Sequence, residues 1–242
     1  MLPRKKIARN YNYTNVEPIT FAKLDEETQS RIDRISEEFK NGFTLIKNPN
    51  KSVTFWGSAR TPSDDPMYIK AEKLAARIST ELGHTILTGG GPGIMAAGNC
   101  GAYDAGGKSM GLTIKLPFEQ KTNLCLTHHM DFKYFFARKV CLAFASESYV
   151  YFPGGFGTLD ELFEILTLVQ TKKIDPAPSI ILVGKKYWKG LDKFIKKTVL
   201  KEQMISPEDL NLYTITDDEE EIINLIKKSP AREATILAST DN

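Results

Sequence analysis

The sequence predicts one α/β domain built on a doubly wound parallel sheet, preceded by an N-terminal helical arm. From Ser52 onward, short β-rich runs alternate with longer helical runs, a pattern typical of strands joined by helical crossovers. The runs predicted as strands are apolar, as in a parallel sheet covered by helices on both faces. Right-handed crossovers then wind the sheet in two directions, which is a Rossmann-like arrangement.

The elements are expected to alternate along the chain. Strands are predicted at residues 53–56, 85–88, 109–115, 149–152, 179–183 and 212–216, with 124–128 as a further short strand or an extended link. Helices are predicted at residues 68–82, 94–105, 132–146, 159–171, 187–200 and 218–228. Asp217 is expected to cap the last helix, because Glu220 follows three residues later.

The region before the sheet has a different character. Residues 25–40 are highly charged, and Ile32, Ile35 and Phe39 recur at helical spacing within them. We therefore divide the chain into an arm with one helix (residues 1–50), a single α/β domain (51–230) and a flexible tail (231–242).

Composition excludes several classes of protein. The chain has 242 residues, of which 41% are hydrophobic, and its 32 basic and 30 acidic residues give a net charge of +2. Such a balance gives no reason to expect a nucleic acid or a membrane surface as a partner. No run approaches the roughly 18 apolar residues that span a bilayer, and no signal-peptide pattern follows the basic start. The chain is therefore expected to be cytoplasmic.

Cysteine and histidine are both scarce. Cys100, Cys125 and Cys141 are odd in number and widely spaced, without a CxxC pair, so reduced thiols are expected rather than a disulfide or a zinc site. The three histidines form no HExxH motif, and His128 and His129 are interpreted as structural. We expect no metal and no cofactor.

The first glycine turn, residues 89–93, follows a predicted strand and opens a helix. It reads Gly89-Gly90-Gly91-Pro92-Gly93. Glycines let a ligand approach the backbone closely, and a helix N-terminus attracts anions. A turn that merely joins strand to helix is the alternative, but four glycines exceed what such a connection needs. This pattern favours a ligand site that includes Gly89, Gly90 and Gly91.

The second glycine turn, residues 153–158, has the same position after a strand. Gly154, Gly155, Phe156 and Gly157 are followed by Thr158, whose hydroxyl could bind a phosphate oxygen. Thr158 and Glu161 also have the spacing of a capping box, in which each side chain bonds the other residue's backbone. On local pattern alone, capping and catalysis both remain open for Glu161. The preceding glycines favour a site.

Other candidates are weaker. Ser58 and Arg60 leave the first strand and could face a pocket, although a single glycine there is no dinucleotide fingerprint. Arg138 and Lys139 interrupt an apolar helix, which is typical of a solvated edge, and Glu119 would be an ordinary loop charge.

Taken together, these motifs resemble those of the LOG (Lonely Guy) family, once widely labelled as lysine decarboxylases. The matching pieces, in family order, are Gly57-Ser58, the first glycine turn with Ile94-Met95, the Arg138-Lys139 pair, and Pro-Gly-Gly-x-Gly-Thr-x-x-Glu at residues 153–161. The last motif is specific, and the similarity covers roughly residues 52–194.

The resemblance implies a Rossmann-like homodimer that hydrolyses nucleoside 5′-monophosphates to a free base and ribose 5-phosphate. Arg138 and Glu161 match the family's catalytic pair. The positions that match its substrate-binding residues are Lys139, Gly154, Gly155, Gly157, Thr158 and, in an acidic pocket position, Glu119. Phe136 and Ala137 depart from the His and the acidic or amide residue that cytokinin-producing members usually carry there.

Three hypotheses about function follow. In the hydrolase, Glu161 would stabilise the positive charge on the ribose and activate water, while Arg138 would hold the substrate. A binding module for a nucleotide or a molybdenum-type cofactor is the main alternative, and an NADP-type oxidoreductase is a third. A decarboxylase is disfavoured, because no lysine stands in a context that marks a pyridoxal phosphate site.

Overall fold

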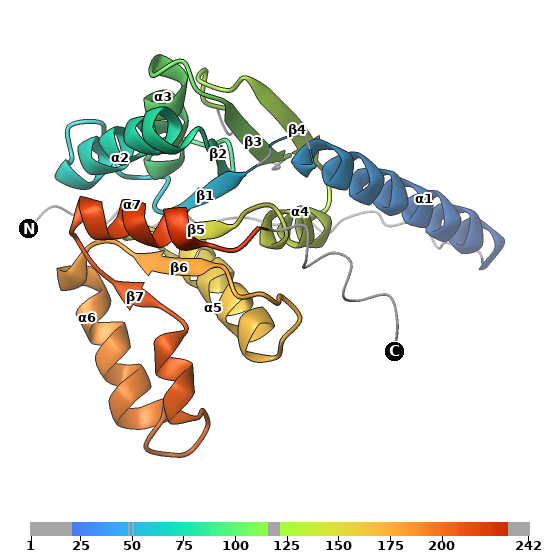
Figure 1. The fold of residues 1–242 in the computed structure, drawn as a ribbon. Helices are drawn as coiled ribbons and strands as arrows, with labels where there is room; N and C mark the ends of the chain where they lie inside the picture. The colour runs from blue at the N-terminus through green and yellow to red at the C-terminus, as the bar shows by residue number, and fades with distance from the viewer. Residues whose placement is uncertain (1–20, 48, 50, 116–121, 232–242) are drawn as a thin grey trace, which may run out of the picture.

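A single parallel sheet organises the computed structural model, which describes residues 21–115, apart from 48 and 50, and residues 122–231. The sheet has seven strands in the order β4-β3-β2-β1-β5-β6-β7 (Figure 1). All six neighbouring pairs are parallel. The strands are β1 Ser52–Trp56, β2 Thr85–Thr88, β3 Ser109–Ile114, β4 His128–Phe132, β5 Ser148–Tyr151, β6 Ser179–Leu182 and β7 Thr214–Ile215. The chain winds outward in both directions from β1 and β5, so the predicted doubly wound fold is confirmed.

Helices cover both faces of the sheet. They are α1 Phe21–Ile46, α2 Pro66–Leu82, α3 Ile94–Asp104, α4 Phe135–Ala143, α5 Phe156–Gln170, α6 Lys185–Phe194 and α7 Glu219–Lys228, with short helical turns at Ile195–Val199 and Pro207–Asn211. Alternate residues of each strand enter different cores. On β5, Tyr149 and Tyr151 pack in the core that includes residues of α4, α5 and α6, whereas Val150 packs in the core with α2, α3 and α7.

The largest departure from the predicted elements concerns β4. Residues 124–128 were expected to form a short strand or an extended link, but the strand begins at His128 and runs to Phe132, paired along its length with β3. Helix α4 therefore begins at Phe135 rather than Phe132. The strand lies at the sheet edge and most of its residues are exposed, so it lacks the apolar run that marks a buried parallel strand.

The N-terminus of the last helix also differs. Asp218, not Asp217, caps α7, because its carboxylate accepts hydrogen bonds from the backbone of Glu220 and Glu221. Asp217 instead accepts a 2.6 Å bond from the Gly184 N–H, and so connects β7 to the start of α6. The sequence offered two adjacent aspartates with equal capping chemistry, and only the position of the chain distinguishes them.

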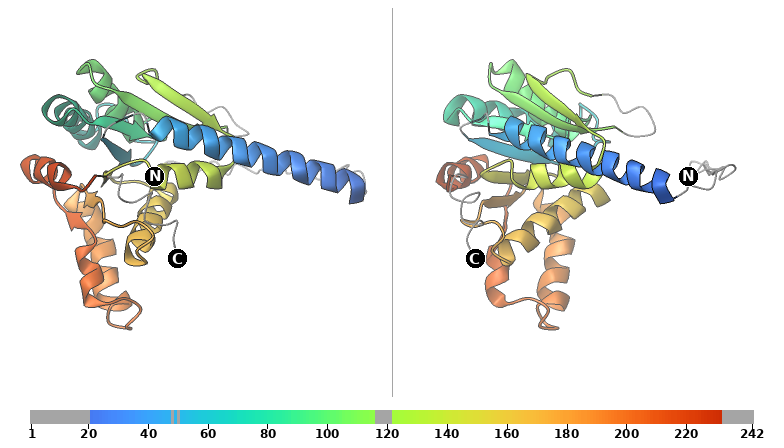
Figure 2. Two further views of the ribbon diagram at one scale, coloured as in Figure 1. Left: turned by 45° about the vertical axis from the view of Figure 1, so that its right-hand side comes forward. Right: turned by 90° about the vertical axis from the view of Figure 1, so that its right-hand side faces the viewer.

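Helix α1 is longer than predicted and holds α4 in position. It packs on α4 and β4 at its C-terminal end, while its N-terminal part projects beyond the rest of the fold (Figure 2). Because α4 has no side-chain cap of its own, Glu38 of α1 supplies one, accepting bonds from the N–H groups of Lys133 (2.7 Å) and Tyr134 (3.2 Å). The helical arm is therefore part of the framework beneath Arg138. The division at residues 50 and 230 remains a prediction.

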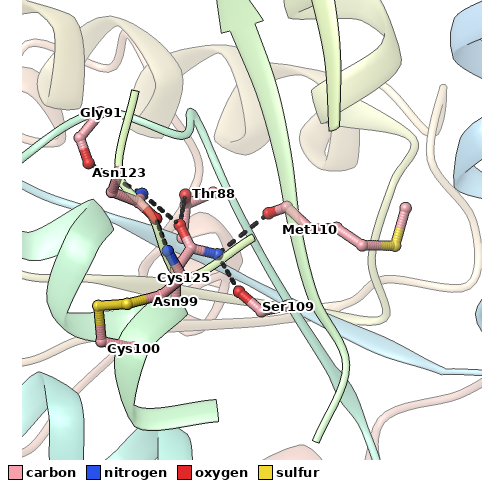
Figure 3. Close-up of a disulfide and its surroundings, with 8 residues drawn as sticks. All are labelled: Thr88, Gly91, Asn99, Cys100, Ser109, Met110, Asn123 and Cys125. Carbon is pink, nitrogen blue, oxygen red and sulfur yellow. Dashed lines mark hydrogen bonds between the residues drawn. A yellow bond between two sulfur atoms is a disulfide. The ribbon is translucent and has the colours of Figure 1, made fainter. Parts of the chain in front are cut away.

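A disulfide joins Cys100 of α3 to Cys125, so the expectation of reduced thiols is wrong for these two residues (Figure 3). The residues are 25 positions apart in sequence, and only the packing of the segment before β4 against α3 brings them together. Cys141 is free and buried, and burial raises the pKa of its thiol to about 12. Within the described ranges, no helix is both long and apolar enough to cross a membrane.

Candidate active site

A cavity of about 970 Å³ opens where the strand order reverses between β1 and β5. In doubly wound sheets, ligands bind in this crevice, beyond the carboxyl ends of the strands. The turn after β1, the second glycine turn after β5 and the first turn of α5, up to Glu161, form most of its wall. The lining residues from the other elements are Trp56, Met95, Ile114, Phe135, Arg138 and Tyr187.

The second glycine turn presents unpaired backbone N–H groups to this cavity. Helix α5 begins at Phe156 without a side-chain cap, and its first intrahelical bond runs from the Leu159 N–H to the Gly155 carbonyl. The N–H groups of Phe156, Gly157 and Thr158 have no partner among the described residues. Such a helix start is a binding site for an anion. The capping-box interpretation is wrong, because Thr158 lies within the helix and caps nothing.

The glycines of this turn are not all needed by the protein's own packing. A Cβ on Gly154 would overlap the side chain of Thr158. A Cβ on Gly155 or Gly157, in contrast, would meet no atom within 4 Å. Phe156 between them is 93% exposed at the cavity wall. Both glycines are exposed and line the cavity.

Arg138 is buried, so the solvated-edge interpretation is wrong for it. Its Nε donates a 2.6 Å hydrogen bond to the Leu112 carbonyl, and its guanidinium lies 5.9 Å from the ring centre of Phe135. Burial lowers its pKa, while the Glu161 carboxylate opposes this change. A Cβ on Gly89 would overlap the guanidinium, so the absence of a side chain there makes room for Arg138.

The side chain of Lys139 pairs with carboxylates on α5. Its Nζ lies 2.6 Å from Asp160 Oδ2 and 3.6 Å from Glu164 Oε2. Burial lowers the pKa of Lys139, but the hydrogen bond to Asp160 and the charges of Glu161 and Glu164 outweigh it, and the net shift is upward. Lys139 does not line the cavity.

Glu161 is the titratable group that this environment changes most clearly. It lines the cavity, is 5% exposed, and its buried Oε2 has no hydrogen-bond partner in the part of the chain that the structure describes. Burial raises its pKa to about 8, and Glu164 adds to the increase, while Lys139 and Arg138 oppose it. Displaced pKa values of this kind are typical of acid–base residues in active sites.

Ser58 lines the cavity and connects its walls. Its N–H donates to the Pro153 carbonyl (3.0 Å), and its carbonyl accepts from the Ile94 N–H (3.0 Å). Its hydroxyl accepts a bond from the Arg60 N–H. Ser58 therefore fixes the start of α3 relative to the second glycine turn.

The first glycine turn is buried beneath the cavity rather than lining it. Thr88 accepts a bond from the Gly90 N–H (2.9 Å) and donates to Asn99. Asn123 donates to the carbonyls of Gly90 (2.9 Å) and Gly91 (3.1 Å), as Figure 3 shows in part. A ligand role for Gly89, Gly90 and Gly91 remains a prediction. Glu119 lies outside the described residues.

Three aromatic residues of the wall were not among the predicted site residues. Trp56 precedes Gly57-Ser58 and could have been found from the motif. Its buried Nε1 has no hydrogen-bond partner within the described ranges. Tyr187 of α6 donates a 2.5 Å bond to the Gly154 carbonyl, and Phe135 opens α4. No local pattern connects these last two residues to the turns that they approach.

Fold and cavity together define an α/β protein with an uncapped helix start at the switch point of its sheet. The family model described as "Possible lysine decarboxylase" matches residues 95–226, more than half of the chain, and the chain belongs to this family. The predicted resemblance to the LOG proteins is confirmed by relatives of that name.

One such relative is LOG5 of Arabidopsis thaliana, a cytokinin riboside 5′-monophosphate phosphoribohydrolase. It is 25% identical over 197 residues, covering 81% of this chain and 86% of LOG5. Among solved structures, the structural-genomics protein TM1055 has a TM-score of 0.56 at 19% identity, covering 74% of this chain and 99% of its own. The molybdenum cofactor carrier protein of Chlamydomonas reinhardtii has a TM-score of 0.53 at 23% identity, with coverages of 74% and 97%. At the level of the family, the curated relatives support a phosphoribohydrolase activity.

Proposed function

We propose that this protein hydrolyses the N-glycosidic bond of a nucleoside 5′-monophosphate, either AMP-like or a cytokinin ribotide, giving a free base and ribose 5-phosphate. The observation that carries the proposal is the buried Oε2 of Glu161, which has no hydrogen-bond partner among the described residues, in the same cavity as the uncapped start of α5. The carboxyl group suits the carbon that reacts, and the helix start suits a phosphate.

The 5′-phosphate binds the N–H groups of residues 156–158. Three unpaired donors and the positive end of the helix dipole favour a doubly charged group. The open space at Gly155 and Gly157 lets phosphate oxygens reach the backbone, and the Thr158 hydroxyl adds a further donor. This binding fixes the distance between the phosphate and the ribose carbon that reacts.

Glu161 acts on that ribose carbon. When the carbon–nitrogen bond breaks, the ribose gains oxocarbenium-like charge. The ionised carboxylate stabilises this charge and takes a proton from the attacking water. The hydroxide oxygen bonds to the ribose, and the departing base keeps the electron pair of the broken bond and receives a proton. Arg138, fixed by the Leu112 carbonyl, contributes positive charge beside the substrate.

A second copy of the chain is proposed to pack against α4. Phe135 and Phe136 on this helix are 53% and 49% exposed, and exposed aromatic clusters are typical of interfaces. Light scattering during size-exclusion chromatography should give twice the mass of one chain. A single-chain mass would contradict the proposed homodimer.

The deciding experiment is base release from a panel of nucleoside monophosphates, with the matching nucleosides as controls. We expect release from the monophosphates only, and a loss of about 1,000-fold in kcat for Glu161→Gln with binding retained. Nucleotide binding without release from any substrate, unchanged in Glu161→Gln, would contradict the proposal. That result would favour a nucleotide or molybdenum-cofactor binding protein, the alternative that Phe136 and Ala137 support.

A further inference from the structure

The site contains a second carboxyl group that the proposed reaction does not use. Glu164 follows Glu161 by three residues, so the two side chains lie on the same face of α5. Oε2 of each residue is buried and has no hydrogen-bond partner among the described residues. This spacing places the two carboxyl groups side by side, and the charge of Glu164 raises the pKa of Glu161. A hydrogen bond between two carboxyl groups forms only when one of them carries a proton.

Charged and titratable groups face this pair from α4 and β5. From α4, Lys139 faces Glu164 at 3.6 Å, beyond hydrogen-bond distance, and it is already paired with Asp160. Arg138 faces Glu161 from the same helix. From β5, the Tyr151 hydroxyl donates to the backbone carbonyl of Glu161 rather than to either carboxylate, and burial raises the pKa of Tyr151 well above its ordinary value. The Glu161 side chain is buried, so the neighbouring charge of Glu164 makes the ionisation of Glu161 costly.

We propose that Glu164 is a positioning residue of this site, whose carboxylate, held in place by Lys139, accepts a hydrogen bond from the protonated carboxyl group of Glu161. Glu164 does not line the cavity, so it acts through Glu161 and not on the substrate. Glu161 reacts once it has lost this proton. Its carboxylate then takes a proton from the attacking water and passes it to the departing base, and so regains its starting state. The inference rests on the proposed hydrolysis and deepens it.

The test is the pH profile of kcat in matched variants. In Glu164→Gln the amide donates a hydrogen bond to an ionised Glu161. The midpoint of the rise in kcat with pH should therefore move down by about one pH unit. In Lys139→Met the loss of a positive charge should move it up. Opposite shifts are not expected from a merely structural disturbance. Glu202→Gln, an exposed change of the same kind away from the cavity, should leave the midpoint unchanged.

A substrate-free measurement separates this inference from the proposed function. Carbon-13 NMR of labelled glutamate side chains follows the protonation of Glu161, assigned through Glu161→Gln, whether or not the protein turns over a nucleotide. A lower titration midpoint in Glu164→Gln supports the pair even if no base is released. An unchanged midpoint overturns the pair, even if base release and its loss in Glu161→Gln uphold the hydrolase.

Discussion

The two glycine turns look alike in sequence but differ in what surrounds their glycines. In the first turn, a Cβ on Gly90 would overlap Thr113, and a Cβ on Gly93 would overlap the Ser58 carbonyl. In the second turn, a Cβ on Gly155 or Gly157 would meet no atom within 4 Å. The first turn therefore has glycines because the protein packs against it. The second has two glycines that the protein's packing does not require, which is expected where a ligand approaches the backbone.

The hydrogen bonds of the two turns differ in the same sense. Thr88 and Asn123 bond the backbone of the first turn, and the Cys100–Cys125 disulfide secures the segment that carries Asn123. The second turn has three N–H groups without partners among the described residues. The first turn supports the site, since Gly89 leaves room for Arg138. The second turn has N–H groups that are available to bind a ligand.

The largest effect is expected from Gly93→Ala. Gly93 has φ +67°, and its Cβ would overlap backbone atoms that cannot move independently, so we expect a loss of about 4 kcal/mol in the free energy of unfolding. Gly83→Ala is the control, because Gly83 has φ +65° but open space around it, and it should lose only about 1 kcal/mol. Urea unfolding measures both. Equal losses in the two variants would mean that the first turn is not packed as described.

Removal of the disulfide should have the next largest effect. Replacing Cys100 and Cys125 by serine should lower the free energy of unfolding by about 3 kcal/mol, because the cross-link closes a loop of 25 residues. A reductant should destabilise the natural protein similarly and leave the double variant unchanged. Three titratable thiols in the unreduced, unfolded chain would show that this bond does not form.

The second turn should respond in binding rather than in stability. In Gly157→Ala, the added methyl group occupies the space above the backbone, and we expect base release to fall about 100-fold, or about 2.7 kcal/mol. Stability should stay equal or rise by up to about 1 kcal/mol, because alanine favours helix. Gly190→Ala in α6 is the matched control, since it also has open space and lies outside the cavity lining. Full activity in Gly157→Ala would remove the distinction between the turns.

The smallest effect concerns stability and pH. The pKa of Glu161 in the fold, about 8, lies above its ordinary value of 4.5, so the stability that its protonation provides is complete below pH 4.5. This stability is lost as pH rises toward 8. Glu161→Gln lacks this dependence. Its free energy of unfolding, relative to that of the natural protein, should rise by roughly 2 kcal/mol between pH 6 and 9. Melting temperatures across that range test it, and parallel pH curves for the two proteins would contradict the displaced pKa.

Much of the fold follows from local patterns. Apolar strands such as β1 and β5 bury every residue, and runs of this kind are visible without any tertiary knowledge. The sheet-edge strand β4 was predicted at the wrong residues, because its exposed residues carry no such pattern. The same limit applies to charged residues. Arg138 and Lys139 are adjacent and chemically similar, yet one lies in the cavity and the other pairs with α5.

By itself, the sequence determined the doubly wound sheet, the two glycine turns and the motif that contains Glu161. These depend on residue types at fixed short spacings, because backbone conformation is a local property. Only the tertiary structure decided which turn is buried, that Cys100 meets Cys125, and that Glu38 caps α4. It also decided that Glu161 is shielded from water beside Glu164. Burial, and the electrostatic energy that depends on it, arises from residues distant in sequence, so no local pattern contains it.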